Sequence, residues 1–135
     1  MKRKLTVDLR PGDYTVLKLP VDAPAPAGLL AATTGLVSLT RTAQECSVVC
    51  PTDLAPPAAE SDGGWRLLTV RGPLEFTLTG IMAALSGALA AAGVALFAVS
   101  TFDTDHILVK QADLDAAVTA LREAGHDVVD PTTVR

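Results

Sequence analysis

The stretch GPLEFTLTGIMAALSGALAAAGVALFAVSTFDTDHILVK, residues 72–110, decides the fold of this chain. A Gly-Pro pair leads into an apolar segment. Five of its residues recur at the spacing of one helix face: Leu78, Ile81, Met82, Leu85 and Leu89. Thr77 or Thr79 is suited to cap the start of this helix, and Gly93 is suited to the position just after its end.

The segments on either side of this helix extend the pattern. Two strands are predicted at residues 95–100 and 106–110, around an acidic turn, and Asp113 is expected to cap a second helix. The inner face of that helix is predicted to hold Leu114, Ala117, Val118 and Leu121. With strands at residues 65–71 and 127–129, the order is β-α-β-β-α-β, which predicts a ferredoxin-like α+β fold with both helices on one face of an antiparallel sheet.

The first half of the chain is richer in strands and prolines. Alternating apolar residues predict strands at residues 4–9, 14–19, 36–42 and 46–50. A helix of at most two turns is expected between residues 26 and 35, because the prolines before it exclude a longer one. Residues 52–64 carry Pro, Ala, Ser and Gly without a period and are predicted to be a linker.

The first half also resembles a degenerate copy of the second. LTRTAQECSVV (residues 39–49) aligns with VSTFDTDHILV (residues 99–109) at a shift of 60, as two hairpins with polar turns. The alternative explanation is a chance match between two hairpins of similar composition. The predicted organisation is a degenerate N-terminal module (residues 1–51), the linker, and a C-terminal module (residues 65–130).

Composition excludes several classes of function. The 135 residues contain 11 basic and 15 acidic side chains, and this net negative charge argues against nucleic acid or an anionic membrane as a partner. The basic N-terminus has no apolar run behind it, so no signal peptide is expected and the predicted location is cytoplasmic. Two cysteines and two histidines form no cluster with zinc-ligand spacing, and we expect no metal or cofactor.

Catalysis is not expected either. Ser100, Asp103 and His106 are the residue types of a hydrolytic triad, but they crowd one hairpin and no oxyanion-hole motif accompanies them. Calcium-loop spacing is also missing around Asp103 and Asp105. We therefore predict a protein that is not an enzyme.

Four segments carry a resemblance to a known family. They are SLTRTAQECSVVCP (residues 38–51), GWRLLTVRGPLEFTLTGI (residues 64–81), AGVALFAVSTFDTDHILVK (residues 92–110) and the helix from Asp113. Together they resemble the ACT-domain superfamily, and within it the small tandem ACT proteins of the CASTOR arginine-sensor group. The resemblance implies two ACT modules side by side in one continuous antiparallel sheet of eight strands, with a free amino acid bound at the seam between the modules.

An amino acid needs donors for its carboxylate and acceptors for its ammonium group. The helix entry is expected to supply the donors, because the first N–H groups of a helix are unpaired and favour an anion. The candidate residues there are Gly72, Leu74, Glu75, Leu78, Gly80 and Ile81. Glu75 would hold a cationic group or simply lie near the positive end of the helix dipole, and Gly72-Pro73 is equally typical of an ordinary tight turn.

The acidic turn is expected to supply the acceptors. Its candidate residues are Thr101, Phe102, Asp103, Thr104 and Asp105. Asp105 is the strongest single candidate, and Phe102 would form an apolar wall if it points inward; the alternative is a solvated hairpin turn. The resemblance implies that Ser47 and Val48 form the opposite wall of the pocket, although Ser47 also suits an ordinary strand.

The leading hypothesis is thus a regulatory protein that senses a free amino acid. The alternative is an ACT-like structural module without a ligand, which acts by forming a homodimer or by binding an unknown regulated protein. A small enzyme of ferredoxin-like fold is the third and least supported possibility.

Overall fold

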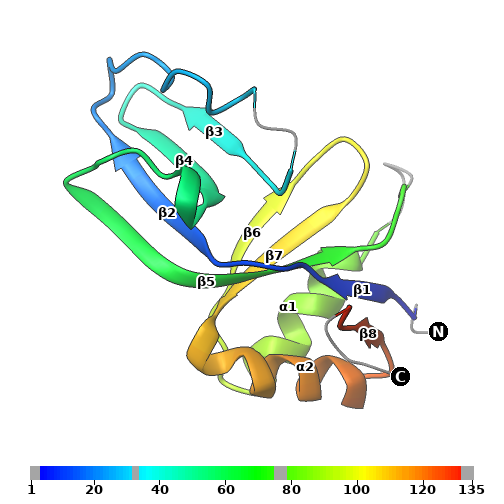
Figure 1. Ribbon diagram of the computed structural model, residues 1–135. Helices are drawn as coiled ribbons and strands as arrows, with labels where there is room; N and C mark the ends of the chain where they lie inside the picture. The colour runs from blue at the N-terminus through cyan, green and yellow to red at the C-terminus, as the bar shows by residue number, and fades with distance from the viewer. Residues whose placement is uncertain (1–3, 32–33, 75–78, 132–135) are drawn as a thin grey trace. The chain divides into compact units, whose positions relative to one another are not determined.

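The structure is a computed structural model, and it describes residues 4–31, 34–74 and 79–131 (Figure 1). The chain divides into two compact units. One contains the residues up to Pro11 and those from Arg66 onward, and the other contains Gly12–Trp65. We describe each unit separately and refer to them as the helical unit and the hairpin unit.

The helical unit has the predicted β-α-β-β-α-β order. Its elements are the second half of β5 (Glu60–Val70), α1 (Ile81–Ala91), β6 (Phe97–Ser100), β7 (Asp105–Lys110), the 3₁₀ turn η2 (Gln111–Asp113), α2 (Leu114–Glu123) and β8 (Asp127–Val129). The two helices lie side by side on one face of the strands (Figure 1). The ferredoxin-like α+β prediction is confirmed for this part of the chain.

One apolar core joins both helices to the strands. Its buried helix residues are Ile81, Leu85 and Leu89 from α1 and Leu114, Ala117 and Leu121 from α2. They pack against strand residues such as Val70, Ile107 and Val109, which point to the same face of the sheet. Burying one such large aliphatic side chain contributes about 1.5–3 kcal/mol. The helix faces predicted from spacing are therefore the faces that the fold buries.

An additional strand is inserted into this unit. β1 (Thr6–Leu9) pairs antiparallel with β5, Val7 opposite Val70, and parallel with β8, Val7 opposite Val128. The sequence division assigned this strand to the N-terminal module, but its backbone pairs with strands of the C-terminal one. Its alternating apolar side chains, with Val7 fully buried, complete the core beneath the helices.

The first helix begins later than expected. α1 starts at Ile81 after Gly80, which adopts a left-handed φ of 81° that favours glycine, and no side chain caps it. Thr79 therefore does not cap the helix, and Thr77 lies outside the described residues. The carbonyl of Gly80 accepts the first helical hydrogen bond, from the N–H of Ala84 at 2.9 Å.

The hairpin unit consists of strands and loops. Its elements are β2 (Tyr14–Leu19), β3 (Ser38–Arg41), β4 (Cys46–Pro51), the 3₁₀ turn η1 (Thr52–Leu54) and the first half of β5. β4 lies between β3 and β2, and β2 also pairs with β5. The core of this unit holds Leu17, Leu19, Leu29, Cys46, Val48 and Cys50.

Two expectations for this unit were wrong in detail. The described residues between 26 and 35 form turns and no helix, because Gly28 and Gly35 adopt positive φ angles that break a helical run. The predicted linker also ends early, since β5 already begins at Glu60.

Eight strands are joined by backbone hydrogen bonds. The order is β3-β4-β2-β5-β1-β8, with β7 paired to both β5 and β6. In the described part of the chain the fold is α+β, with eight strands and two α-helices. The α+β class predicted from the sequence is confirmed, and so is the sheet of eight strands that the family resemblance implied. Of the helices that the structure describes, neither is long and apolar enough to cross a membrane.

Candidate functional site

The predicted acidic turn forms a tight connection between β6 and β7. Ser100 pairs with Asp105 at the ends of the two strands. Inside the turn, both the N–H and the hydroxyl of Thr101 donate to the carbonyl of Thr104, at 2.9 Å and 3.1 Å. The turn therefore has one defined backbone shape, which fixes where its carboxylates emerge.

The turn is held against the segment that leads from β5 toward α1. The N–H of Leu74 donates to the carbonyl of Asp103 at 2.6 Å, and the hydroxyl of Thr104 donates to the carbonyl of Val70 at 2.6 Å. The helix-entry segment and the acidic turn were predicted as two halves of a site, and the structure brings them into direct contact. The N–H of Leu74 is consequently engaged within the protein.

Gly72 lies at the point of closest approach in this junction. A Cβ atom at this position would lie 3.0 Å from the carbonyl oxygen of Asp103, 3.1 Å from the nitrogen of Leu74 and 3.2 Å from the Cβ of Thr104. Two of these neighbours are backbone atoms, which cannot rotate away. Any larger residue here would have to displace its neighbours by a few tenths of an ångström, so space favours glycine. The Gly72–Pro73 peptide bond is cis.

The acidic side chains differ in their surroundings. Asp105 is half-buried, and its Oδ1 accepts a hydrogen bond from the hydroxyl of Ser100 at 2.6 Å. Asp103 is exposed, and Phe102 at the tip of the turn is 79% exposed. A carboxylate can accept about four hydrogen bonds, so Asp105 keeps acceptor capacity beyond the bond from Ser100.

His106 follows the turn and was not among the predicted ligand residues. It is half-buried on β7, with Nδ1 3.0 Å from the hydroxyl of Thr69 on β5 and Nε2 3.4 Å from the hydroxyl of Thr101. Burial lowers the pKa of His106 below 6.5, the nearby Asp105 carboxylate raises it, and the Arg10 guanidinium lowers it. Because the lowering effects prevail, the imidazole is neutral at physiological pH.

The remaining predicted residues lie elsewhere or are not described. Glu75 and Leu78 fall outside the described residues. Ile81 packs in the core of the helical unit and Gly80 is exposed beside it.

Ser47 and Val48 belong to the hairpin unit, on β4. Their strand pairs on both sides, Val48 opposite Leu39 and Leu17, so its backbone groups serve the sheet. The side chain of Val48 is fully buried, whereas Ser47 is half-buried on the opposite face.

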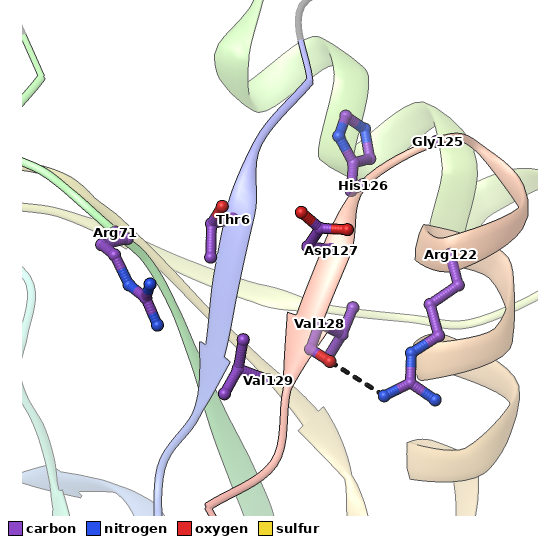
Figure 2. Close-up of a pocket in the computed structure, with 8 residues that line it drawn as sticks. All are labelled: Thr6, Arg71, Arg122, Gly125, His126, Asp127, Val128 and Val129. Carbon is purple, nitrogen blue, oxygen red and sulfur yellow. Dashed lines mark hydrogen bonds between the residues drawn. The ribbon is translucent and has the colours of Figure 1, made fainter.

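An open hollow of about 580 Å³ lies along β8 in the helical unit (Figure 2). Its lining includes Arg71, whose guanidinium contacts Asp8 at 2.5 Å, and Arg122, which donates from α2 to the carbonyl of Val128 at 2.8 Å. His126 also lines it and accepts a hydrogen bond from the N–H of Leu5. No sequence motif marks these residues. The pairing of β1 with β8 brings Thr6 beside Asp127, while Arg71 follows β5 and Arg122 comes from α2.

Metal-ligating side chains are not clustered in the part of the chain that the structure describes. Across residues 4–31, 34–74 and 79–131, no three His, Cys, Asp or Glu side chains are placed to hold a metal ion. Cys46 and Cys50 are both buried and not joined by a disulfide, and burial raises the pKa of the Cys50 thiol, with a smaller contribution from Asp53. These thiols are core residues.

Comparison with known proteins shows which family part of this sequence matches. Residues 60–123 match the sequence model of a family described as ACT domain. The cytosolic arginine sensor for mTORC1 subunit 1 from Rattus norvegicus is 37% identical over 70 residues, which cover 50% of this chain and 21% of the rat protein. The chain therefore spans about a fifth of the length of this relative.

Solved structures match over nearly the whole chain. The protein Atu0741 from Agrobacterium tumefaciens superposes with a TM-score of 0.88 at 33% identity, over 99% of this chain and 98% of that one. The regulatory subunit of aspartate kinase from Thermus flavus superposes with a TM-score of 0.62 at 13% identity, over 90% of this chain and 99% of that one. The second match shows the fold alone.

Proposed function

The chain belongs to the ACT-domain family, and from that premise we propose that it binds a free amino acid and acts as a regulatory sensor rather than as an enzyme. The matched rat protein is named an arginine sensor, and the Thermus flavus protein is named a regulatory subunit. We further propose the cytosol as its location, in line with the name of the rat relative.

The observation that best supports this proposal is the junction between the acidic turn and the helix-entry segment. Two hydrogen bonds, from Leu74 to Asp103 and from Thr104 to Val70, fix the turn before any ligand arrives. A site fixed in advance loses less conformational entropy on binding. Asp103 and Asp105 then offer carboxylates to an ammonium or guanidinium group, which form strong charge-assisted hydrogen bonds.

Arginine is the first amino acid to test, because the matched relative is named for it and the junction is acidic. We propose the segments around Gly72 and Asp105, both in the helical unit, as the ligand position. Ser47 and Val48 remain predictions from the sequence. Glu75 and Leu78 remain predicted contributors at the helix entry. The proposed output is contact with a regulated protein or with a second copy of the chain.

Isothermal titration and thermal denaturation of the full chain with each of the twenty amino acids test this proposal. A ligand present at one hundred times its Kd stabilises a protein by about 2.7 kcal/mol, which raises the melting temperature measurably. Asp105→Asn should weaken binding by removing the charge while keeping the shape, and Asp115→Asn on the exposed side of α2 is the matched control. If no amino acid stabilises the chain at millimolar concentration, the sensing function is wrong.

An interaction module without a ligand is the second candidate, and strand β6 favours it. β6 pairs with β7, and its sequence FAVS carries no charge or proline that would discourage pairing with a further strand. Light scattering with and without arginine separates the two functions. A dimer that forms equally well without any amino acid would support the interaction module, and a change of mass on adding arginine would support the sensor.

A further inference from the structure

His106 connects the acidic turn to the centre of the helical unit. Its ring lies between the hydroxyl of Thr69 on β5 and the hydroxyl of Thr101 at the start of the turn. The Thr101 hydroxyl in turn reaches the carbonyl of Thr104. Three side chains thus form one hydrogen-bonded line from the sheet to the backbone of the turn.

The direction of these hydrogen bonds follows from counting protons. A threonine hydroxyl has one hydrogen, and Thr101 gives it to the carbonyl of Thr104 at 3.1 Å. Toward His106 the Thr101 oxygen can therefore only accept, so the proton of the neutral ring lies on Nε2. Nδ1 is then the acceptor, and it receives the hydroxyl hydrogen of Thr69.

Charged groups approach the same ring from two elements. Asp105 precedes it on β7, and Arg10 follows β1, the strand beside β5; they act on the pKa of His106 in opposite directions. Burial adds to the effect of Arg10, so the neutral ring is favoured when the site is empty. A proton taken up on Nδ1 would reverse the hydrogen bond with Thr69 and place a positive charge next to Asp105.

We propose that His106 is a positioning residue of the amino-acid site, which in its neutral form holds the turn in place and in its protonated form weakens amino-acid binding. This inference rests on the proposed sensing function. Neutral His106 leaves the Asp105 carboxylate to the ligand's ammonium group. Protonated His106 attracts that carboxylate and repels the same ammonium group, so the proton and the amino acid exclude one another.

This competition has a thermodynamic consequence. An amino acid that binds only when His106 is neutral must displace the proton from chains that carry one. The affinity then falls by up to about tenfold for each pH unit below the pKa of His106, and binding in that range releases a proton. Below that pKa the protein would sense its amino acid poorly, and above it the response would not depend on pH.

Titration calorimetry with L-arginine between pH 7.5 and 5.5 tests this proposal in the wild type and in His106→Gln. Glutamine can donate and accept at comparable positions but does not titrate. We expect the wild-type Kd to rise as the pH falls, with a binding enthalpy that depends on the ionisation enthalpy of the buffer. His106→Gln should bind arginine at pH 7.5 and show neither effect; a variant that keeps the full pH dependence overturns the proposal.

The chain offers a matched control, because it contains only one other histidine. His126 accepts a hydrogen bond at Nδ1 from the N–H of Leu5, and asparagine can present an oxygen at that position. His126→Asn should therefore retain the pH dependence of arginine binding. If it abolishes that dependence, the dependence does not come from His106 and the proposal is wrong.

A measurement without ligand separates this inference from the sensing function. Amide hydrogen exchange at Thr101 and Leu74 reports whether the turn is held in place. At pH 7.5 we expect faster exchange in His106→Ala and near wild-type exchange in His106→Gln. If arginine gives no heat in any variant, arginine sensing fails, and the exchange data alone then decide whether His106 positions the turn: unchanged exchange in His106→Ala overturns it.

Discussion

The two hairpins of this chain share one turn geometry and differ in what holds the turn. In β3–β4 the N–H of Thr42 donates to the carbonyl of Glu45 at 2.9 Å, and in β6–β7 the N–H of Thr101 donates to the carbonyl of Thr104 at 2.9 Å. The Thr42 hydroxyl accepts from the N–H groups of Gln44 and Glu45, which closes that turn on itself.

The second turn is instead tied to the rest of its unit. Leu74 and Val70, which lie outside the hairpin, bond to the turn directly, and His106 of β7 connects the turn to Thr69 on β5. Hydrogen bonds within the turn are sufficient for a turn that only connects two strands. A turn fastened at three points has a fixed position as well as a fixed shape, which is what a binding site requires.

The strand registers also correct the alignment of the two hairpins. Arg41 pairs with Cys46 and Ser100 pairs with Asp105, so the hairpins match at a shift of 59 and not 60. A slip of one residue exchanges the two faces of a strand. The counterpart of Ser47 is therefore His106, since these residues pair with Thr40 and Val99 at equivalent positions.

Among the proposed substitutions in the two hairpins, replacing Gly72 by alanine should lower the free energy of unfolding the most. The new methyl group would meet backbone atoms at 3.0 Å and 3.1 Å and push the second turn away, with an expected loss of about 1–3 kcal/mol in the free energy of unfolding. Urea denaturation measures the loss. Gly87→Ala in α1 is the control, because a Cβ there meets nothing within 4 Å and should add about 0.5–1 kcal/mol. Equal stability of the two variants would contradict the tight junction.

Removing the Thr104 hydroxyl tests a second anchor of the turn. Thr104→Val keeps the shape but leaves the carbonyl of Val70 without this donor, and we expect a loss of about 1–2 kcal/mol. Thr104→Ser retains the hydroxyl and should lose less. Glu45 occupies the equivalent position in the first turn and is exposed, so Glu45→Val should change stability by at most about 0.5 kcal/mol. A similar loss in both hairpins would show that the second turn is not specially anchored.

The second hairpin contains His106, which should make the stability of the protein depend on pH. Its pKa in the folded state is lowered, so the unfolded chain binds a proton first as the pH falls. The free energy of unfolding should therefore be fully retained above pH 6.5 and should decrease as the pH falls from 6.5 through the folded pKa. His106→Gln should reduce this slope, as measured by urea denaturation at several pH values. An unchanged slope would assign the effect to other groups.

Local patterns in the sequence were sufficient to predict most helices and strands, but not to predict which strands pair with one another. The spacing of Leu85 and Leu89 and of Ala117 and Leu121 predicted both helix faces, since burial on one side imposes that period. The alternation of residues 4–9 predicted a strand, but no local feature says that β1 lies between β5 and β8. Pairing over such distances depends on the whole fold.

The candidate site shows the same limit. The acidic turn and Gly72 were recognisable from composition and turn chemistry. Their contact joins residues about thirty positions apart, and no residue spacing in the sequence predicts it. His106 was considered only for catalysis and metal binding, because a single histidine between an aspartate and an apolar run has no motif. The available signal was its strand alternation, which places it on the opposite face of β7 from Ile107 and Val109 and on the same face as Leu108, which is also fully buried.

The smallest expected loss of stability comes from a substitution in the first turn, and it serves as the reference for the other substitutions. Thr42→Ala removes an acceptor that serves two exposed N–H groups, both of which water can satisfy, so we expect a loss of about 0.5 kcal/mol. Thr101→Ala removes a similar hydroxyl but also interrupts the line from His106 to Thr104. Hydrogen exchange should then accelerate at Leu74, outside the mutated hairpin, whereas Thr42→Ala should affect only its own turn. Acceleration beyond the first hairpin in Thr42→Ala would mean that both turns are coupled to their surroundings, and the proposed distinction between them would be lost.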